Sequence, residues 1–248
     1  MSRTFQAADW DQYQMDWHDP HRSLEPLQQE IDVVDAALVE LVEGGILAHR
    51  QYSHELFLAL RAAVRKRFEI PWTAISPRMQ RLIYAINAVA QPQIIVAVGI
   101  FCGNTFISNA GAAVGPGACY RARRLTGLEI RKSEAERAST NVATIDLHGD
   151  AEIIADDGLP FLRDFDDQID LLYLDADGGG GKGKSIYLDL LEAARHALHP
   201  GSLVLAHNSV NAASELGDYL SRVRDPAECR ASANMIVDDQ GLEVSICA

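Results

Sequence analysis

Basic residues and cysteine are scarce in this sequence, and both shortages limit what the protein binds. The 248 residues include 22 Lys and Arg against 35 Asp and Glu, which gives a formal net charge of -13 at pH 7. This negative charge repels phosphate backbones and anionic lipid surfaces, so we expect neither a nucleic-acid nor a membrane partner. The four cysteines are far apart and form no CxxC pair, so we expect free thiols rather than structural zinc or a disulfide scaffold.

Long apolar runs are also missing. No run of apolar residues approaches the length that spans a bilayer. The first residues, MSRTFQAADWDQYQ, are polar and acidic and lack the apolar core of a secretory signal, so we expect a cytoplasmic location. Apolar residues nevertheless make up 48% of the chain and charged residues 23%, the composition of an ordinary globular protein. The length suits one large α/β domain with an N-terminal elaboration.

The N-terminal third has the periodicity of helices. Apolar residues recur at a spacing close to 3.6 over residues 24–42, and the glycine pair at 44–45 predicts the end of that helix. A second helix is predicted over residues 49–68. Ser76 followed by Pro77 predicts the start of a third helix, with the serine as N-cap and the proline in the first turn.

From residue 93 onward, short apolar runs alternate with segments that are long enough to form helices. Runs that are apolar throughout indicate strands buried on both faces, hence a parallel sheet with right-handed crossovers. The C-terminal segment predicts an antiparallel hairpin that turns at residues 238–241. The predicted parallel strands are residues 94–98, 125–129, 152–155, 169–175 and 202–206.

A glycine-rich turn follows the first of these strands, in the sequence VGIFCGNT. Gly99 and Gly103 allow the backbone to turn sharply and to approach a ligand beyond the carboxyl end of the strand. Acidic residues follow the next three strands, and the first of them, Glu129, can accept both ribose hydroxyls of a nucleoside. Helix capping explains any one of these acids, but it explains their joint arrangement less well. The other acids are Asp156, Asp157, Asp175 and Asp177.

From about residue 76 to the C-terminus, the sequence resembles the class I S-adenosylmethionine (SAM)-dependent methyltransferases. It is most similar to the small O-methyltransferases of the catechol and caffeoyl-CoA type. The resemblance rests on six ordered pieces: VAVGIFCGNT, GLEI, IIADDGLPFL, DLLYLDAD, YLDLLEAARHALHPGSLVLAHN and the terminal QGL hairpin. It implies a Rossmann-like, doubly wound α/β sheet of seven strands, mostly parallel with the last strand antiparallel. It divides the chain into an N-terminal helical cap over residues 1–75 and a SAM-binding domain over residues 76–248.

The resemblance also implies SAM as the cosubstrate, together with the residues that bind it. The glycine turn would hold the methionine part of SAM, Glu129 the ribose, and the segment around Asp157 the adenine. The implied cofactor-binding residues are Gly99, Phe101, Gly103, Asn104, Thr105, Glu129, Asp156, Asp157, Gly158 and Asp175.

Two positions depart from the pattern of that family. Ala97 stands where the family has an acid that helps to hold the amino end of SAM. His207 and Asn208 stand where metal-dependent members present an Asp-Asn pair. The loss of an anionic oxygen ligand weakens a Mg²⁺ site, so we expect an active site without a metal ion. The predicted catalytic residues are then Asp175, His207 and Asn208, with His207 or Asp175 as a base.

Residues 178–185 compete with this interpretation, because GGGGKGKS fits the P-loop pattern for nucleoside triphosphates. Asp175 and Asp177 directly precede the loop and would oppose phosphate charge. No later strand ends in an acid that would help to hold Mg²⁺. We therefore expect either a mobile active-site loop, in which Lys182 or Lys184 contacts a substrate carboxylate, or a flexible surface loop.

Aromatic residues crowd a short polar segment near the N-terminus, with Trp72 further along the chain. Such residues usually attach a helix to the core. The alternative is a cap over the pocket that contacts substrate, where aromatic faces would also stabilise a sulfonium by cation–π attraction. The predicted substrate-contacting residues are Trp10, Tyr13, Trp17 and His18.

The sequence leaves three functions open. The first is methyl transfer from SAM to a small-molecule acceptor without a metal ion. The second is a cyclase that resembles azetidine-2-carboxylate synthase, in which the amine of SAM attacks its own γ-carbon and releases methylthioadenosine. The third is a non-catalytic SAM-binding subunit. The expected partners are SAM and a small-molecule acceptor, with a homodimer as an open alternative to a monomer.

Overall fold

The computed structural model describes residues 2–73 and 75–248. Three helices precede the first central strand, as the periodicity predicts. Ser76 caps the third of them, because its hydroxyl accepts a hydrogen bond from the Met79 amide 3.1 Å away. The second helix begins later than predicted because Ser53 caps it. These helices are α1 (Leu27–Glu43), α2 (His54–Arg67) and α3 (Pro77–Ala90).

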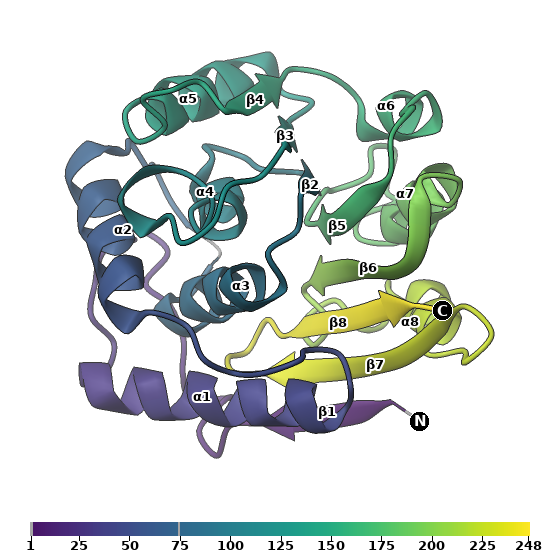
Figure 1. Cartoon of the computed structure of the whole chain (residues 1–248), viewed down its shortest axis with the longest axis horizontal. Helices are drawn as coiled ribbons and strands as arrows, with labels where there is room; N and C mark the ends of the chain where they lie inside the picture. Colours follow the sequence, from purple (N-terminus) through teal and green to yellow (C-terminus); the bar gives the residue numbers. More distant parts are fainter. Residues whose placement is uncertain (1, 74) are drawn as a thin grey trace.

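The described residues form one sheet of eight strands in the order β1-β7-β8-β6-β5-β2-β3-β4 (Figure 1). Neighbouring strands run parallel except at β8, which pairs antiparallel with β6 and with β7. The α/β sheet with an inserted antiparallel last strand is therefore confirmed. The strands are β1 (Arg3–Gln6), β2 (Ile94–Val98), β3 (Arg124–Leu128), β4 (Ala151–Ile154), β5 (Ile169–Leu174), β6 (Leu198–His207), β7 (Cys229–Ile236) and β8 (Leu242–Cys247).

The eighth strand corrects the expected number of seven. β1 lies at the edge of the sheet and pairs in parallel with β7. Its sequence, Arg-Thr-Phe-Gln, is short and mostly polar, so it carries no apolar run that periodicity would detect. Arg3 ties the strand to α1 through ion pairs with Glu40 and Glu43. The first residues of the chain therefore extend the sheet as well as preceding the helices.

Two apolar layers cover the two faces of the sheet. Alternation along β2 places Ile95 and Ala97 in one buried cluster and Ile94, Val96 and Val98 in the other. Figure 1 shows α3 and α4 on one side of the sheet and α6, α7 and α8 on the other. Burial on both faces explains why these strands are apolar throughout. The later helices are α4 (Asn104–Ala110), α5 (Lys132–Ala143), α6 (Gly158–Arg163), α7 (Ile186–Ala194) and α8 (Gly217–Val223), and residues Gly115–Gly117 form a 3-10 turn.

A buried arginine anchors the N-terminal segment to α3. The Arg78 side chain is inaccessible to solvent and donates to the carboxylates of Asp9 and Glu25. Its guanidinium also lies 3.8 Å from the centroid of the Tyr13 ring. Removing one partner from such a buried pair leaves an uncompensated charge, which is strongly destabilising. The polar segment before α1 is thereby fixed against α3.

No helix within the described ranges combines the length and the apolar character needed to cross a bilayer.

Candidate functional site

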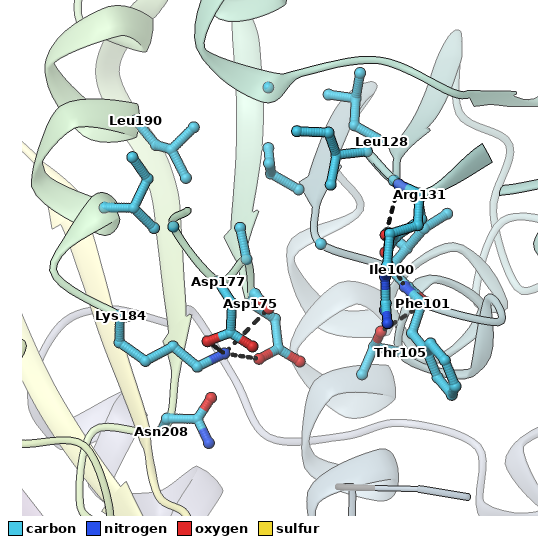
Figure 2. Close-up of a pocket in the computed structure, with 18 of the residues that line it drawn as sticks. Ile100, Phe101, Thr105, Leu128, Arg131, Asp175, Asp177, Lys184, Leu190 and Asn208 are labelled. Atoms are coloured by element: carbon cyan, nitrogen blue, oxygen red, sulfur yellow. Dashed lines mark hydrogen bonds and ion pairs between the residues drawn. The ribbon is translucent and has the colours of Figure 1, made fainter. Parts of the chain in front are cut away.

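A cavity of about 730 Å³ opens at the carboxyl ends of β2, β3 and β5 (Figure 2). The strand order reverses at β2: β3 and β4 follow on one side of it, and β5 and β6 lie on the other side. Open α/β sheets bind ligands at this type of switch point, because loops from both directions diverge there. Of the ten predicted cofactor-binding residues, nine line the cavity: Gly99, Phe101, Asn104, Thr105, Glu129, Asp156, Asp157, Gly158 and Asp175.

The glycine turn after β2 depends on two glycines in different ways. Gly99 has φ +84°, and a Cβ there would lie 2.5 Å from the Ala176 Cα, so only glycine fits between the ends of β2 and β5. Gly103 does not line the cavity, although the resemblance implies that it binds SAM. It precedes α4 with φ +88° and packs against Ala138 of α5, where a Cβ would lie 3.3 Å from the Ala138 Cα. Gly103 therefore allows the start of α4 to pack closely against α5.

Glu129 lies at the carboxyl end of β3 with only 4% of its surface exposed. One carboxylate oxygen accepts from the Phe101 amide at 2.8 Å, and the other accepts from the Arg131 amide at 3.1 Å and its Nε at 3.0 Å. An ionised carboxylate can accept about four hydrogen bonds, so acceptor capacity remains on the oxygen that faces Phe101. The acid therefore fixes the glycine turn and still offers an acceptor to the cavity.

The acid pair after β4 also lines the cavity. Asp157 caps α6 by accepting from the Leu159 amide at 2.9 Å, while Asp156 accepts from the Asp157 amide at 2.8 Å. The following Gly158 packs tightly against β2, because a Cβ there would lie 2.5 Å from Cγ1 of Val98. Capping thus accounts for one carboxylate oxygen of Asp157 and leaves the other available to a ligand.

Asp175 and Lys184 form a mostly buried ion pair at the end of β5 (Figure 2). The Lys184 Nζ lies 3.0 Å from Oδ1 of Asp175, 3.2 Å from its carbonyl oxygen and 3.5 Å from Oδ1 of Asp177. Burial opposes both charges, but the Lys184 ammonium holds the pKa of Asp175 below its ordinary value. The two aspartates likewise overcome the burial of Lys184 and raise its pKa.

His207 is fully buried at the end of β6 and does not line the cavity. Its Nδ1 lies 3.4 Å from Oδ2 of Asp175, on the side away from Lys184. This burial corrects the expectation that the ring faces the substrate, since its strand is central and its side chain points into the molecule. The imidazole packs beside Asp175 without a hydrogen bond to it and has no direct access to a ligand.

Asn208, the next residue, does line the cavity. It has φ +67°, and its amide donates to Oε1 of Gln240 at 3.1 Å, while its own Oδ1 is buried without a hydrogen-bond partner among the described residues. An unpartnered buried acceptor is costly, so it marks a place where a ligand donor would be favoured.

Gln240 and Thr73 are polar residues of the cavity lining that were not predicted from the sequence. Gln240, in the turn between β7 and β8, accepts from Asn208 and also from Asn211 at 2.7 Å. The QGL piece indicates a hairpin but not its contact with the cavity, because Gln240 reaches the cavity only through the insertion of β8 beside β6. Thr73 lines the cavity and accepts a hydrogen bond from Asn104 at 3.2 Å.

Of the four predicted substrate-contacting residues, only Trp17 lines the cavity. Its ring centroid lies 6.1 Å from that of Trp72, which in turn lies 4.4 Å from that of Phe101. Trp17 and Trp72 keep 46% and 38% of their surfaces exposed, so two partly exposed aromatic side chains border the cavity. Neither Trp10, nor Tyr13, which packs under Arg78, nor the exposed His18 belongs to the lining.

The P-loop-like segment folds back on itself instead of forming an open phosphate cradle. Gly178 and Gly183 form a bridge, with the Gly178 amide donating to the Gly183 carbonyl at 2.9 Å. Lys184 points to Asp175, and Lys182 pairs with Asp189 of α7 at 2.7 Å. Both lysines of the loop are therefore engaged by carboxylates.

Comparison with known proteins supports a methyltransferase interpretation of this region. Residues 96–209 match the model of a methyltransferase domain. The match confirms the resemblance that the glycine turn and the strand-end acids indicate. None of the curated proteins matches the chain in sequence.

Solved structures share the fold at low sequence identity. The O-methyltransferase TomG from Streptomyces achromogenes, in complex with SAM, is 19% identical with a TM-score of 0.58, covering 90% of this chain and 100% of its own. The O-methyltransferase from Bacillus cereus, in complex with SAH, is 15% identical with a TM-score of 0.56, covering 88% and 100%. The SAH-bound methyltransferase PaMTH1 from Podospora anserina is 13% identical with a TM-score of 0.61, covering 92% and 99%.

The residues that would form a metal site do not fit a divalent ion. Within the described parts of the chain, no group of three or more His, Cys, Asp or Glu residues is arranged to hold a metal. Asp175 and Asp177 instead share the ammonium of Lys184, whose charge repels a second cation. His207, which replaces the anionic ligand, is buried behind Asp175.

Proposed function

We propose that the protein is a SAM-dependent methyltransferase that transfers the methyl group to a small-molecule acceptor without a metal ion. The observation that carries this proposal is the buried Glu129, which holds the glycine turn and offers an acceptor to the same cavity. The methionine part of SAM would lie along the turn, its ribose hydroxyls would donate to Glu129, and its adenine would meet Asp157. The methyltransferase domain match and the SAM- and SAH-bound relatives support this assignment.

The chemistry of the proposed reaction is an in-line displacement. An acceptor oxygen attacks the sulfonium methyl carbon, the new O–C bond forms as the S–C bond breaks, and SAH leaves as a neutral thioether. The acceptor proton passes to the Asp175 carboxylate. Lys184 keeps that carboxylate ionised and in place, and His207 supports it from behind. Most of the acceleration comes from positioning the two substrates.

The Lys184 ammonium also accounts for the proposed independence from metal. In this site it supplies the positive charge between Asp175 and Asp177. A fixed ammonium can hold the acceptor oxygen near Asp175 by hydrogen bonding and by charge. The site therefore has its own cation where a divalent ion would otherwise balance the aspartates.

The N-terminal segment, within residues 1–75, is proposed to cap the acceptor side of the cavity. The Trp17 carbonyl accepts from the Thr73 amide at 3.1 Å, which joins this segment to the loop that carries Trp72. The exposed faces of Trp17 and Trp72 suit a flat, largely apolar acceptor, and they would also attract a sulfonium.

One observation favours a second candidate function. Ala97 is fully buried, so no carboxylate projects from this position to hold the ammonium of SAM. The amine could then attack the γ-carbon, break the S–Cγ bond and release methylthioadenosine together with the azetidine ring. The proton that the amine loses would pass to Asp175.

Product analysis distinguishes these functions. The purified protein is incubated with SAM alone and then with SAM plus a panel of small phenols and hydroxy acids, and the products are identified by mass spectrometry. We expect SAH to accumulate only when an acceptor is added. Accumulation of methylthioadenosine from SAM alone would show the cyclase instead. If neither product forms although SAM binds, the protein is a non-catalytic SAM-binding subunit.

A further inference from the structure

Two cysteines that are distant in sequence face each other across the β7–β8 hairpin. Cys229 and Cys247 are register partners at the open end of this hairpin. The Ala248 amide donates to the Glu228 carbonyl at 3.2 Å, so the adjoining residues form a hydrogen-bonded pair of the ladder. Pairs alternate along an antiparallel ladder, which makes Cys229 and Cys247 a non-hydrogen-bonded pair. The Cys229 amide supports this, because it donates to the Asp225 carbonyl instead of across the ladder.

This type of pair has the spacing that a disulfide needs. Directly opposite residues in non-hydrogen-bonded pairs have Cα atoms about 4.5 Å apart, with their side chains close together. Disulfides occur at Cα separations of about 4.4–6.8 Å, so the spacing of this type of pair suits a disulfide, although the ladder is irregular between Cys229 and Ala231. Both residues are free thiols in this structure.

The two thiols differ in access to solvent. Cys229 is buried, with 7% of its surface exposed, whereas Cys247 is partly exposed. Both line a cavity of about 220 Å³ between α7, α8 and β8, which is several times the volume of a peroxide molecule. The neighbouring Cys229 thiol lowers the pKa of Cys247, although burial opposes the shift. The same contact raises the pKa of Cys229, so Cys247 is the thiol that ionises first.

We propose that Cys229 and Cys247 form a reversible dithiol–disulfide site, in which Cys247 reacts first with a small peroxide and Cys229 resolves the product. With hydrogen peroxide, the Cys247 sulfur attacks one oxygen, an S–O bond forms as the O–O bond breaks, and the departing hydroxide takes a proton to become water. The Cys229 sulfur then attacks the Cys247 sulfur, the S–S bond forms, and the sulfenic hydroxyl leaves with the Cys229 proton as a second water. The two thiols lose two electrons, which the peroxide gains, and a dithiol reductant reverses the change.

The pair lies far from the cavity at the carboxyl ends of β2, β3 and β5. The turn of the hairpin carries Gln240 into that cavity, and the cysteines lie at the opposite end of the hairpin. Figure 1 marks the C-terminus at the end of β8. The disulfide therefore closes the hairpin without touching the proposed SAM site. We expect oxidation to raise the thermal midpoint by about 5 °C or more and to leave the affinity for SAM unchanged.

Peptide mapping tests this proposal directly, because trypsin cuts between the two cysteines at Arg230. The full-length protein is treated with hydrogen peroxide, blocked with an alkylating agent and digested without reductant. We expect residues 225–230 to appear linked to residues 231–248, and the link to disappear on reduction. Finding the two peptides separate after peroxide treatment, with their cysteines alkylated or oxidised to sulfinic acid, would overturn the proposal.

Single substitutions test the order of the two steps. In Cys229→Ser, Cys247 should stop at sulfenic acid and react with a sulfenic-acid probe, whereas in Cys247→Ser the buried Cys229 should stay unmodified. Cys119→Ala is the matched control, because Cys119 is exposed and lies outside this cavity, and it should form the linked peptides as the wild type does. Loss of the link in Cys119→Ala would contradict the assignment. If a serine variant does not fold, the wild-type peptide map still decides the question.

Discussion

The ammonium of Lys184 lies 3.0 Å from Oδ1 of Asp175, and His207 contacts the other oxygen of the same carboxylate at 3.4 Å. Lys184 thus holds Asp175 on one side and His207 packs against its other side, at the end of a central strand where the proposed reaction needs a fixed, ionised carboxylate. The loop at residues 178–185 thus places the Lys184 ammonium against Asp175 and Asp177, which border the cavity.

Replacing Lys184 by methionine should lower kcat/KM by about 10- to 100-fold, because Asp175 loses the charge that fixes and ionises it. The control is Lys132→Met, since Lys132 lies exposed on α5 and does not line the cavity. Steady-state kinetics on both variants checks this prediction. Equal effects of the two substitutions would contradict a specific role for Lys184.

The pH profile of Lys184→Met should also change in a defined direction. The pKa of Asp175 lies below its ordinary value while Lys184 is present, and burial alone would raise it. The acidic limb of kcat/KM should therefore move to higher pH in the variant. The same ion pair stabilises the wild type fully above the unfolded pKa of about 3.9, and this contribution is lost as the pH falls through the lower folded pKa. An unshifted acidic limb would show that Asp175 is not the group that must be ionised.

Gly99→Ala should abolish SAM binding or strongly destabilise the protein. The new Cβ would lie 2.5 Å from the Ala176 Cα at a backbone conformation of φ +84°. Gly217→Ala is the matched control, because a Cβ at that position meets nothing within 4 Å. Thermal denaturation and calorimetric titration with SAM measure both outcomes. A variant at Gly99 that keeps wild-type stability and affinity is incompatible with the close approach of β2 and β5.

The paired aspartates also predict how the enzyme responds to chelation. Because Lys184 already balances Asp175 and Asp177, SAM consumption should persist in excess EDTA. The rates with and without EDTA are compared, and Mg²⁺ is then added back. Loss of activity in EDTA with recovery on Mg²⁺ would place the protein among metal-dependent O-methyltransferases.

ATP should not bind at residues 178–185 despite the P-loop pattern. The loop is closed by its own bridge, and the Lys184 ammonium is engaged by Asp175. Calorimetric titration with Mg-ATP should give no signal at micromolar concentrations. Micromolar binding that disappears in Lys184→Ala would show that the loop cradles phosphate.

Elements with strong local signals could be predicted from the sequence. The apolar strands, Ser76 as a cap and the inserted β8 follow from periodicity, capping and the resemblance, and the strand-end acids follow from the strands. The strands and the cap depend on residues that are close together in sequence, and the position of β8 follows from the fold that the resemblance implies. The parallel strands could be predicted because a strand that is buried on both faces is apolar at every position, which is visible as a continuous apolar run in the sequence.

Features that depend on tertiary contacts could not be predicted. β1 is too short and polar to show a strand pattern, and Gln240 reaches the cavity only because β8 inserts beside β6. His207 lies beside Asn208 in sequence, yet only Asn208 lines the cavity. Which of two adjacent side chains faces a ligand depends on the backbone turn at the end of the strand, where Asn208 has φ +67°.

Calorimetric titration of SAM into the wild-type protein and into Glu129→Ala tests the central claim most directly. The account predicts binding to the wild type and a loss of about 1–3 kcal/mol in the variant, because the ribose hydroxyls lose a charged acceptor. Glu136→Ala is the control, because Glu136 lies exposed on α5. This variant should bind SAM as tightly as the wild type does. Equal SAM affinity in the wild type and in Glu129→Ala, or no binding to either, would contradict the site as described.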